Sequence, residues 1–199
     1  MDEKKTLEKL AVSSVWYMVD YHPYWLKDGT KNPNVDKNSK AIMSLKTPKK
    51  EDEEWKIQKH RAAIKLFTRL LQQALNDKLE DIDFIQIAIV PSSTAGKISD
   101  GLRAIVKSLN TKVTVIFDEK FLVRTRSVTK AHEGGDRSIN KHLDTIQVET
   151  IPSPDIPILL LDDVTTTGNS LNASRDLLNA AGCKNIIMLA IGQTVETNE

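Results

Sequence analysis

The chain has 199 residues and a single cysteine, Cys183. One cysteine excludes a disulfide within the chain and a cysteine-rich zinc site, and it favours a cytoplasmic location. An excess of one charge is also lacking, because 28 Lys and Arg residues stand against 27 Asp and Glu residues, a formal net charge of +1. This balance argues against a general attraction to nucleic acid or to a membrane, although it leaves a local basic segment open.

Long apolar runs and a targeting signal are absent as well. No stretch of apolar residues approaches the length of a membrane span. Residues 1–5 carry charges of both signs, and the apolar core of a secretory signal does not follow them. With 40% hydrophobic and 28% charged residues, the composition is that of a globular protein, and the length suits one compact domain.

Aromatic residues make up only 5% of the chain, and most of the larger rings lie close together. Five of the six Trp and Tyr residues fall between positions 16 and 25: Trp16, Tyr17, Tyr21, Tyr24 and Trp25. We predict a helix over residues 1–26 and a long polar loop over residues 27–54. The rings form either a small layer of the core or a stacking surface for a planar ligand.

Beyond residue 54, helical and strand-like spacings of apolar residues alternate. We predict helices over 55–79, 98–109 and 170–181, core strands over 84–90, 113–117, 156–161 and 185–191, and a short edge strand over 145–150. Near-continuous apolar strands separated by helices indicate a parallel sheet with both faces covered. The predicted fold class is therefore α/β, an open parallel sheet flanked by helices. Residues 1–80 would form an N-terminal helical segment, and residues 81–199 the α/β core.

The run from Ile158 to Ser170 carries the strongest functional signal. An apolar strand leads into Asp162 and Asp163, and a threonine-rich turn closed by Gly168 then opens a helix. Parallel strands deliver such residues to the carboxyl edge of the sheet, where α/β folds bind ligands. Unpaired N–H groups and the dipole of the helix favour a phosphate there, and paired carboxylates suit ribose hydroxyls or a hydrated Mg²⁺. The alternative is a polar turn that only caps the helix.

The segment Asp162-Asp163-Val164-Thr165-Thr166-Thr167-Gly168-Asn169-Ser170 resembles the signature of the type I phosphoribosyltransferases, with Asn169 where glycine is frequent. The resemblance covers roughly residues 84–194 and implies a Rossmann-like core. It also implies that Asp162 and Asp163 hold the ribose hydroxyls of phosphoribosyl pyrophosphate (PRPP), and Mg²⁺ either directly or through water. The 5-phosphate would lie on the turn formed by Thr165, Thr166, Thr167, Gly168, Asn169 and Ser170.

A second loop of small residues follows the first core strand. Its sequence is Ser93-Thr94-Ala95-Gly96-Lys97, and it again stands between a predicted strand and a predicted helix. Small residues allow a ligand to approach the backbone closely, and successive N–H groups can form an anion nest. In phosphoribosyltransferases the corresponding loop binds pyrophosphate. The alternative is an ordinary turn between a strand and a helix.

Residues 124–142 are rich in cations and poor in apolar side chains. A mobile cationic flap is what the departure of pyrophosphate requires, with Arg124, Arg126 and Lys130 as the candidates that stabilise the leaving group. Arg126, Lys130 and His132 resemble the flap of orotate phosphoribosyltransferases, whereas Arg124 and Arg126 resemble the ComF family. The alternative is a solvated basic loop.

These observations lead us to expect a phosphoribosyltransferase that uses PRPP, Mg²⁺ and an unidentified nitrogenous acceptor. The N-terminal 80 residues would form a hood over the acceptor, and a homodimer is one oligomeric state open to the chain. The alternative is a module on the same fold that senses PRPP or a nucleotide without turnover, because a fold and a binding site do not establish a reaction.

Overall fold

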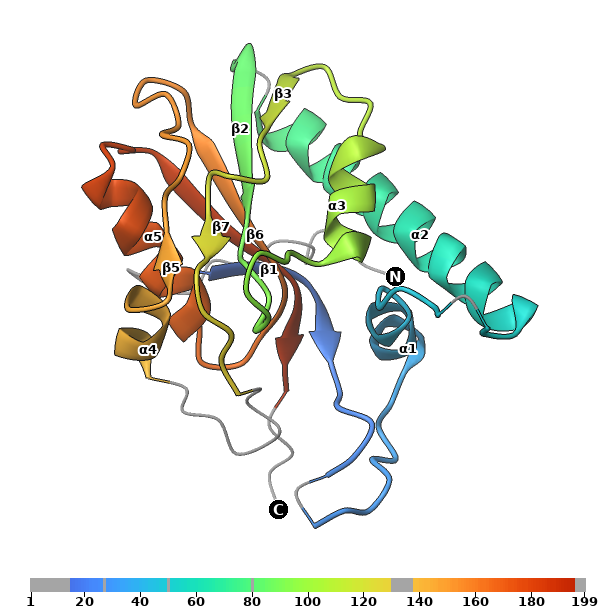
Figure 1. The fold of residues 1–199 in the computed structure, drawn as a ribbon. Coiled ribbons are helices and arrows are strands. Elements are labelled where there is room, and N and C mark those ends of the chain that lie inside the picture. Colours follow the sequence, from blue (N-terminus) through green and yellow to red (C-terminus); the bar gives the residue numbers. More distant parts are fainter. Residues whose placement is uncertain (1–14, 27, 50, 80, 130–137, 196–199) are drawn as a thin grey trace.

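The computed structural model describes residues 15–195 apart from 27, 50, 80 and 130–137. Five strands form one sheet in the order β1-β7-β6-β2-β3, and every neighbouring pair is parallel (Figure 1). Their bounds are β1 Val15–Tyr21, β2 Phe84–Ile89, β3 Thr114–Phe117, β6 Ile158–Thr165 and β7 Ile186–Thr194. The predicted open parallel sheet is therefore confirmed. Two short strands, β4 (Val123–Arg124) and β5 (Ile146–Gln147), pair antiparallel in a separate small sheet.

Helices cover both faces of the main sheet, as predicted. They are α1 (Lys37–Met43), α2 (Glu54–Lys78), α3 (Asp100–Lys107), α4 (Ile139–Leu143) and α5 (Asn169–Ala180). The first three pack on one face, and α5 packs on the other (Figure 1). Among the described residues, none of these helices combines the length and the apolar character that crossing a bilayer requires.

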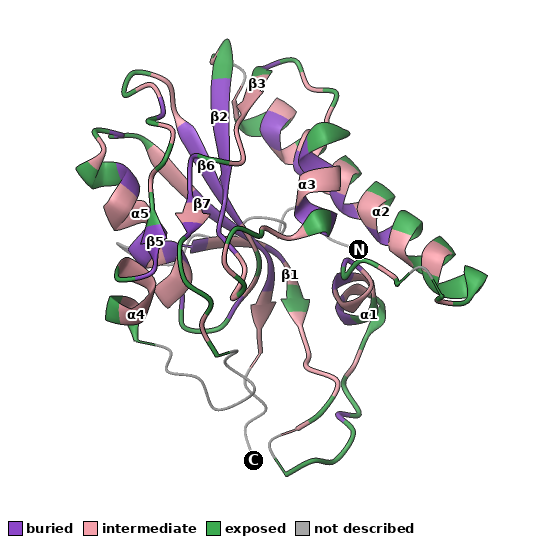
Figure 2. Ribbon diagram, in the orientation of Figure 1, coloured by how far each residue is buried: buried purple, intermediate pink, exposed green. Residues whose placement is uncertain are grey.

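The central strand β6 is buried on both faces because its residues alternate between two apolar clusters. Leu159 and Leu161 face the cluster beneath α1, α2 and α3, whereas Ile158 and Leu160 face the cluster beneath α5. All four side chains are almost fully buried, and much of β6 is purple in Figure 2. Successive side chains of β6 point to opposite faces of the sheet, and both faces are apolar. The sequence of this strand is therefore a continuous apolar run.

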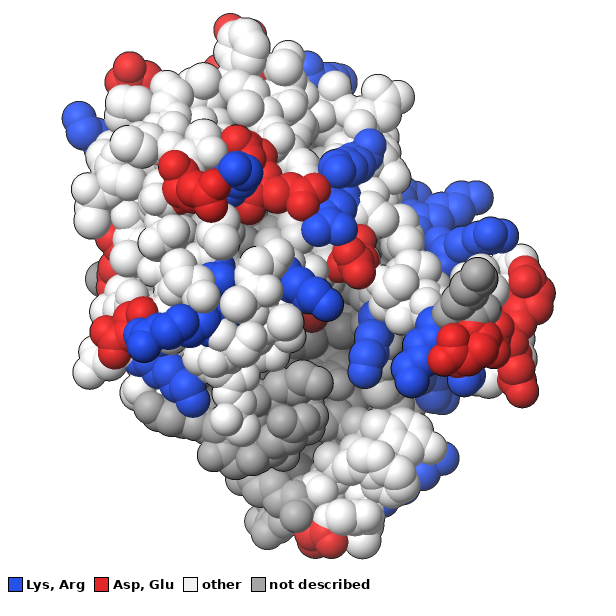
Figure 3. All heavy atoms as spheres, in the orientation of Figure 1, with Lys and Arg blue, Asp and Glu red and all other residues white. Residues whose placement is uncertain are grey.

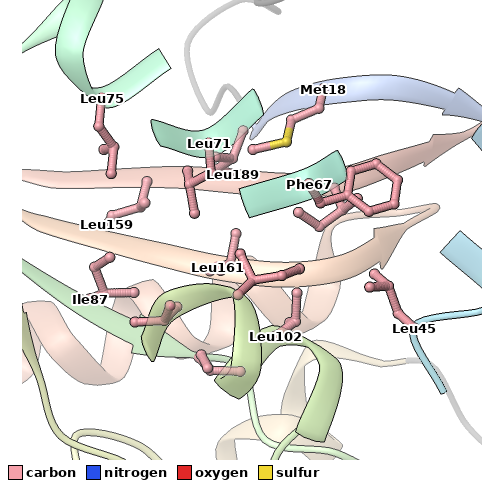
Figure 4. Packing of buried hydrophobic residues seen from close by; sticks show 14 of the residues in the cluster. Met18, Leu45, Phe67, Leu71, Leu75, Ile87, Leu102, Leu159, Leu161 and Leu189 are labelled. Carbon is pink, nitrogen blue, oxygen red and sulfur yellow. The ribbon is translucent and has the colours of Figure 1, made fainter. Parts of the chain in front are cut away.

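The long helix α2 supplies the largest part of the first cluster. Phe67 and Leu71 are fully buried, and they lie over Leu161 and Leu189 of the sheet (Figure 4). Their spacing of four residues puts both on one side of the helix, which confirms the amphipathic helix predicted for residues 55–79. Truncating either side chain to alanine would cost about 2–5 kcal/mol, because a well-packed core does not collapse around the cavity.

The helix predicted for residues 1–26 is wrong over β1, and residues 1–14 lie outside the described residues. Residues 15–21 form an edge strand parallel to β7, with Val15 opposite Met188. Val15 and Tyr17 contact the cluster under α5, whereas Trp16 and Met18 contact the cluster under α2. Because both faces of β1 are apolar, its alternation is hidden in the sequence. The N-terminal segment is thus not wholly helical, and its strand belongs to the core sheet.

Three further boundaries differ from the predictions. The segment 27–54 is not one loop, because Asp36 caps α1 by accepting a hydrogen bond of 2.7 Å from the Ser39 N–H. The predicted strand over 145–150 shrinks to β5, which pairs with β4 and not with the main sheet. Strand β6 continues past Leu161 to Thr165, since the pairing with β7 extends to Thr165 opposite Gln193.

Candidate functional site

The two carboxylates stand near the end of β6, at the carboxyl edge of the sheet. Asp162 lies opposite Ala190 of β7, and its Oδ1 accepts a 2.9 Å hydrogen bond from the Asp163 N–H. Its Oδ2 accepts a 2.9 Å bond from the hydroxyl of Ser170 on α5. Asp163 is exposed, and its Oδ1 accepts a 2.8 Å bond from the Val164 N–H. The pair is therefore oriented by the strand and by the start of the next helix.

Both carboxyl groups are harder to ionise than ordinary ones. Loss of surrounding water, and then the charge of Asp163, raise the pKa of Asp162 well above its usual value, although the hydroxyl of Ser170 opposes the shift. The pKa of Asp163 is raised as well, because protein atoms surround its carboxyl group although the residue as a whole keeps an exposed surface, and the N–H of Val164 opposes this shift. Two adjacent carboxylates repel each other, so a cation or a hydroxyl donor placed between them would relieve this cost.

The turn between β6 and α5 requires a glycine. Gly168 adopts φ +75°, which is strained for any residue with a side chain. A Cβ atom at Gly168 would also lie 3.3 Å from the Asn172 side-chain nitrogen. Gly168 occupies the N-cap position of α5, and no side chain caps this end of the helix. The reading of Asp162, Asp163 and the threonines as a helix cap is therefore wrong.

An uncapped N-terminus leaves backbone N–H groups directed out of the helix, where the dipole favours an anion. The threonines beside it have different surroundings. Thr165 is buried, and the hydroxyl of Thr166 lies 2.9 Å from that of Thr194 on β7. Thr167 is exposed at the tip of the turn. Thr167 is thus the threonine hydroxyl best placed to donate to a bound phosphate.

The remaining members of the predicted phosphate turn, Asn169 and Ser170, form the first turn of α5 and are half-buried. The Ser170 hydroxyl is already engaged with Asp162, so its side chain links the carboxylates to the helix. The structure therefore brings all six predicted residues into one turn around the helix start. It gives Thr165 and Ser170 contacts within the protein.

The second predicted anion loop has used most of its donors. The backbone N–H groups of five loop residues donate to acceptors within the protein. These donors are Ser92, Thr94, Ala95, Gly96 and Lys97. Two of these bonds, of 2.9 Å each, join the Ala95 N–H to the Ser127 hydroxyl and the Gly96 N–H to the Arg124 carbonyl. The anion nest predicted from the small residues is thus largely closed in this conformation, because donors already engaged cannot also hold a ligand.

Arg124 lies in β4 and not in a flap. It is 2% exposed, and its guanidinium donates to the Ser92 carbonyl over 2.6 Å and to the Thr145 hydroxyl over 2.5 Å. Burial lowers the pKa of Arg124, and the charge of Asp162 opposes this shift. A guanidinium fixed in this way holds the β2–α3 loop against the small sheet. The prediction that Arg124 belongs to a mobile flap is therefore wrong.

The segment after Arg124 starts against the same loop. The Val128 N–H donates to the Ser93 carbonyl over 2.8 Å, and the exposed Arg126 donates to the Asp144 carbonyl over 3.1 Å. Lys130 and His132 lie outside the described residues. A small cavity of about 40 Å³ lies between the β2–α3 loop and β4 and is lined by Gly96, Lys97 and Arg124, among others.

Residues from two further strands lie beside the site, one near the acid pair and one at the threonine turn, and the sequence analysis did not assign them to it. Burial and then the charge of Asp163 raise the pKa of Tyr21, at the end of β1. The side-chain amide of Gln193 on β7 lies 3.4 Å from the Thr166 carbonyl. In the sequence, only position could have indicated a role for Tyr21 and Gln193, because each lies at or next to the end of a strand at the carboxyl edge. This position was not recognised, because we predicted a helix over Tyr21 and an end of the last strand before Gln193.

Asp162 and Asp163 fit the chemistry of Mg²⁺ but do not enclose it. Among the described residues, no group of three or more His, Cys, Asp or Glu side chains could hold a metal ion. Magnesium in phosphate-binding sites commonly uses one or two carboxylates and completes its shell with water and substrate oxygens. The pair suits this arrangement, and a site formed by protein ligands alone is not found in this part of the chain.

The fold and this edge define an open parallel α/β protein in which two carboxylates are followed, after a short turn, by an uncapped helix. Comparison with models of protein families gives no match, and neither does comparison with curated proteins. Among solved structures, the chain is similar to a hypoxanthine phosphoribosyltransferase from Staphylococcus aureus in an orthorhombic and a tetragonal crystal form. The identity is 12% over 68% of this chain, and 75% and 74% of those chains are covered, with TM-scores of 0.39 and 0.41. At these values the likeness carries no argument about reaction or substrate.

Proposed function

We propose that this protein binds Mg²⁺-PRPP and transfers its phosphoribosyl group to a nitrogen acceptor. One observation carries the proposal, namely that Asp162 and Asp163 lie near the end of the strand that leads, through a short turn, into the uncapped helix α5. A 5-phosphate at the helix start would accept hydrogen bonds from backbone N–H groups and from the Thr167 hydroxyl. The ribose would then extend from the turn toward the carboxylates, whose oxygens accept hydrogen bonds from its hydroxyls.

In the proposed reaction, the bond between ribose C1 and pyrophosphate breaks, and its electron pair leaves with pyrophosphate. A new bond forms between C1 and the acceptor nitrogen, which releases its proton. The carboxylates of Asp162 and Asp163 balance positive charge on the ribose ring. Magnesium, when bound, neutralises charge on pyrophosphate and on the carboxylates together. Lys97, Arg126 and Lys130 are the proposed cations for the leaving group.

The rival function is a module that binds PRPP or a nucleotide without turnover. A specific observation favours it, because the N–H groups of the proposed pyrophosphate loop are engaged within the protein and Arg124 is buried. A sensor does not need to stabilise departing pyrophosphate, whereas an enzyme would have to open this loop or rely on other groups. Both functions share the ribose and phosphate contacts and differ only at the leaving group.

Two measurements separate these functions. Calorimetry with PRPP, with and without Mg²⁺, tests binding, and release of pyrophosphate in the presence of a panel of nucleobases tests transfer. Binding with release supports the transferase, and binding without release for every base supports the sensor. Absence of Mg²⁺-dependent PRPP binding would overturn the transferase and the PRPP sensor, and calorimetry with nucleotides would then test the remaining form of the rival. With a confirmed acceptor, Arg126→Ala/Lys130→Ala should lower turnover far more than PRPP affinity.

A further inference from the structure

The outer face of α2 carries a concentration of cations that the overall charge conceals. Residues 55–76 contain five Lys and Arg residues and no Asp or Glu. Because the whole chain is nearly neutral, the remainder of the chain carries more acidic than basic residues. Charge is therefore segregated onto this helix, and the near-zero total does not describe the field above it.

Helix geometry places three of these cations in one row. Arg61, Lys65 and Arg69 follow one another at intervals of four residues, which is about 6 Å along a helix, so the row is about 12 Å long. All three are exposed, whereas Phe67 on the opposite side is buried in the core. Figure 3 shows several basic side chains on the side of the molecule where α2 lies, with acidic ones gathered near the N-terminal end of this helix. We call Arg61, Lys65 and Arg69 the basic row.

Some cations elsewhere on the surface are paired with carboxylates, whereas those of the basic row are not. Arg103 and Lys107 each lie about 3 Å from Glu119, and Lys120 lies 2.7 Å from Glu149. Among the described residues, no carboxylate forms an ion pair with a member of the basic row. Unpaired cations in a row repel one another, so a polyanion laid along the helix would relieve this repulsion.

An aromatic ring stands near the start of this face. Trp55 is 50% exposed, and the Lys59 ammonium lies 4.4 Å from the centre of its ring. A Trp beside cations is the combination with which proteins bind single-stranded nucleic acid, because the ring stacks on a base and the cations contact phosphates. Bases in a duplex are already stacked on each other, so the ring favours a single strand.

We propose that the outer face of α2 binds single-stranded nucleic acid, with Lys59 and the basic row on the phosphates and Trp55 on a base. This surface is separate from the carboxyl-edge site, and the proposal does not depend on the function proposed there. It also restricts the expectation drawn from the net charge. The chain as a whole is nearly neutral, but a nucleic acid bound along α2 would contact only the local concentration of cations.

The test is fluorescence anisotropy with a labelled oligothymidylate about 20 nucleotides long, a length that exceeds common single-strand site sizes. Arg61→Gln/Lys65→Gln/Arg69→Gln should weaken binding at least about tenfold at about 50 mM salt. It should also reduce the slope of log affinity against log salt by about 2, because each phosphate contact on a single strand contributes about 0.7. Trp55→Ala should weaken binding of the single strand and leave the salt slope unchanged.

The matched control is Lys120→Gln/Arg175→Gln/Lys184→Gln, which removes the same charge away from α2 and should bind within about twofold of wild type. Thermal melts verify that all variants are folded. Absence of binding by the wild type, or equal losses in both triple variants, would overturn the proposal. The proposal would also be overturned if a duplex bound as tightly as the single strand and if Trp55→Ala did not change the affinity for the duplex. The same is true if poly-glutamate displaces the oligonucleotide as well as unlabelled oligonucleotide does, since that result indicates an acidic protein partner.

Discussion

Two loops at the carboxyl edge of the sheet have similar compositions and opposite states. The β6–α5 turn and the β2–α3 loop both contain a glycine with positive φ, Gly168 and Gly96, and each contains at least one exposed threonine. In the first, the helix start is uncapped and Thr167 is open at the tip. In the second, the Ala95 and Gly96 N–H groups donate to residues of the neighbouring segment.

The difference shows that small and hydroxyl-bearing residues do not by themselves make an anion site. What matters is whether the backbone donors have partners, because an N–H group already bonded within the protein adds little affinity unless that bond is broken. The β6–α5 turn leaves the Thr167 hydroxyl exposed, so this donor is accessible to a phosphate. In the β2–α3 loop, the hydrogen bonds to Ser127 and Arg124 would have to break before the same N–H groups could bind a ligand.

The largest expected effect comes from the acid pair beside the open turn. Asp162→Asn/Asp163→Asn keeps the shape but removes both charges, and amides neither attract Mg²⁺ nor accept ribose hydroxyl protons as strongly. Losing two hydrogen bonds to charged groups should weaken Mg²⁺-dependent PRPP binding about a hundredfold or more. Calorimetry with wild type and variant measures it. Thermal melts serve as the control, and an unchanged affinity in a folded variant would contradict the proposed ribose site.

The next effect belongs to the closed loop and concerns stability. Arg124→Met keeps a long side chain but leaves the Ser92 carbonyl and the Thr145 hydroxyl without the guanidinium. The Thr145 hydroxyl keeps its 2.7 Å bond to the Lys141 carbonyl, whereas the Ser92 carbonyl loses its guanidinium donor. An unsatisfied buried group costs about 1–3 kcal/mol, so the free energy of unfolding should fall by roughly that amount. Urea unfolding monitored by circular dichroism measures the loss. Arg126→Met, which removes an exposed guanidinium, is the matched control and should stay within about 0.5 kcal/mol of wild type. Equal stability of both variants would show that Arg124 does not hold the loop.

A matched pair of threonines compares the loops directly. Thr167→Val removes the open hydroxyl at nearly constant volume, and the loss of a bond to a charged phosphate is worth about 1.5–3 kcal/mol, roughly ten- to a hundredfold in PRPP affinity. Thr94→Val makes the same change in the β2–α3 loop, where we expect an effect below about 0.5 kcal/mol. Both affinities come from calorimetry. If Thr94→Val proved the more damaging, the phosphate would lie on the second loop and the comparison would reverse.

Much of this arrangement could be predicted from the sequence because its local patterns are unambiguous. The apolar run of β6 and the spacing of α2 identify a strand and a helix, and the order of acids, threonines and glycine after Leu161 predicts a ligand at the carboxyl edge. The residues involved are neighbours in the chain, so their spacing already determines that they meet in one turn.

The rest depended on contacts between distant segments. Strand β1 joins the sheet only through β7, more than 160 residues later, and its two apolar faces give no alternation to read. The burial of Arg124 depends on Ser92 and Thr145, and the closure of the β2–α3 loop depends on Ser127. A sequence shows which groups can donate or accept, but it does not show which of them find partners across the fold.

The smallest expected effect distinguishes the loops by pH, because only one of them contains carboxyl groups. The pKa values of Asp162 and Asp163 are raised above 3.8, so these groups hold their protons more tightly in the folded protein than in the unfolded chain. Their favourable contribution is complete below the ordinary pKa and is lost as pH rises through the raised values. The melting temperature of wild type should therefore fall by a few degrees relative to Asp162→Asn/Asp163→Asn between about pH 4 and pH 7. No carboxyl lies between Pro91 and Ser99, so Thr94→Val should keep the pH dependence of the wild type. Parallel melting profiles for wild type and the double variant would show that the acid pair pays no cost for its charge and needs no ligand to relieve it.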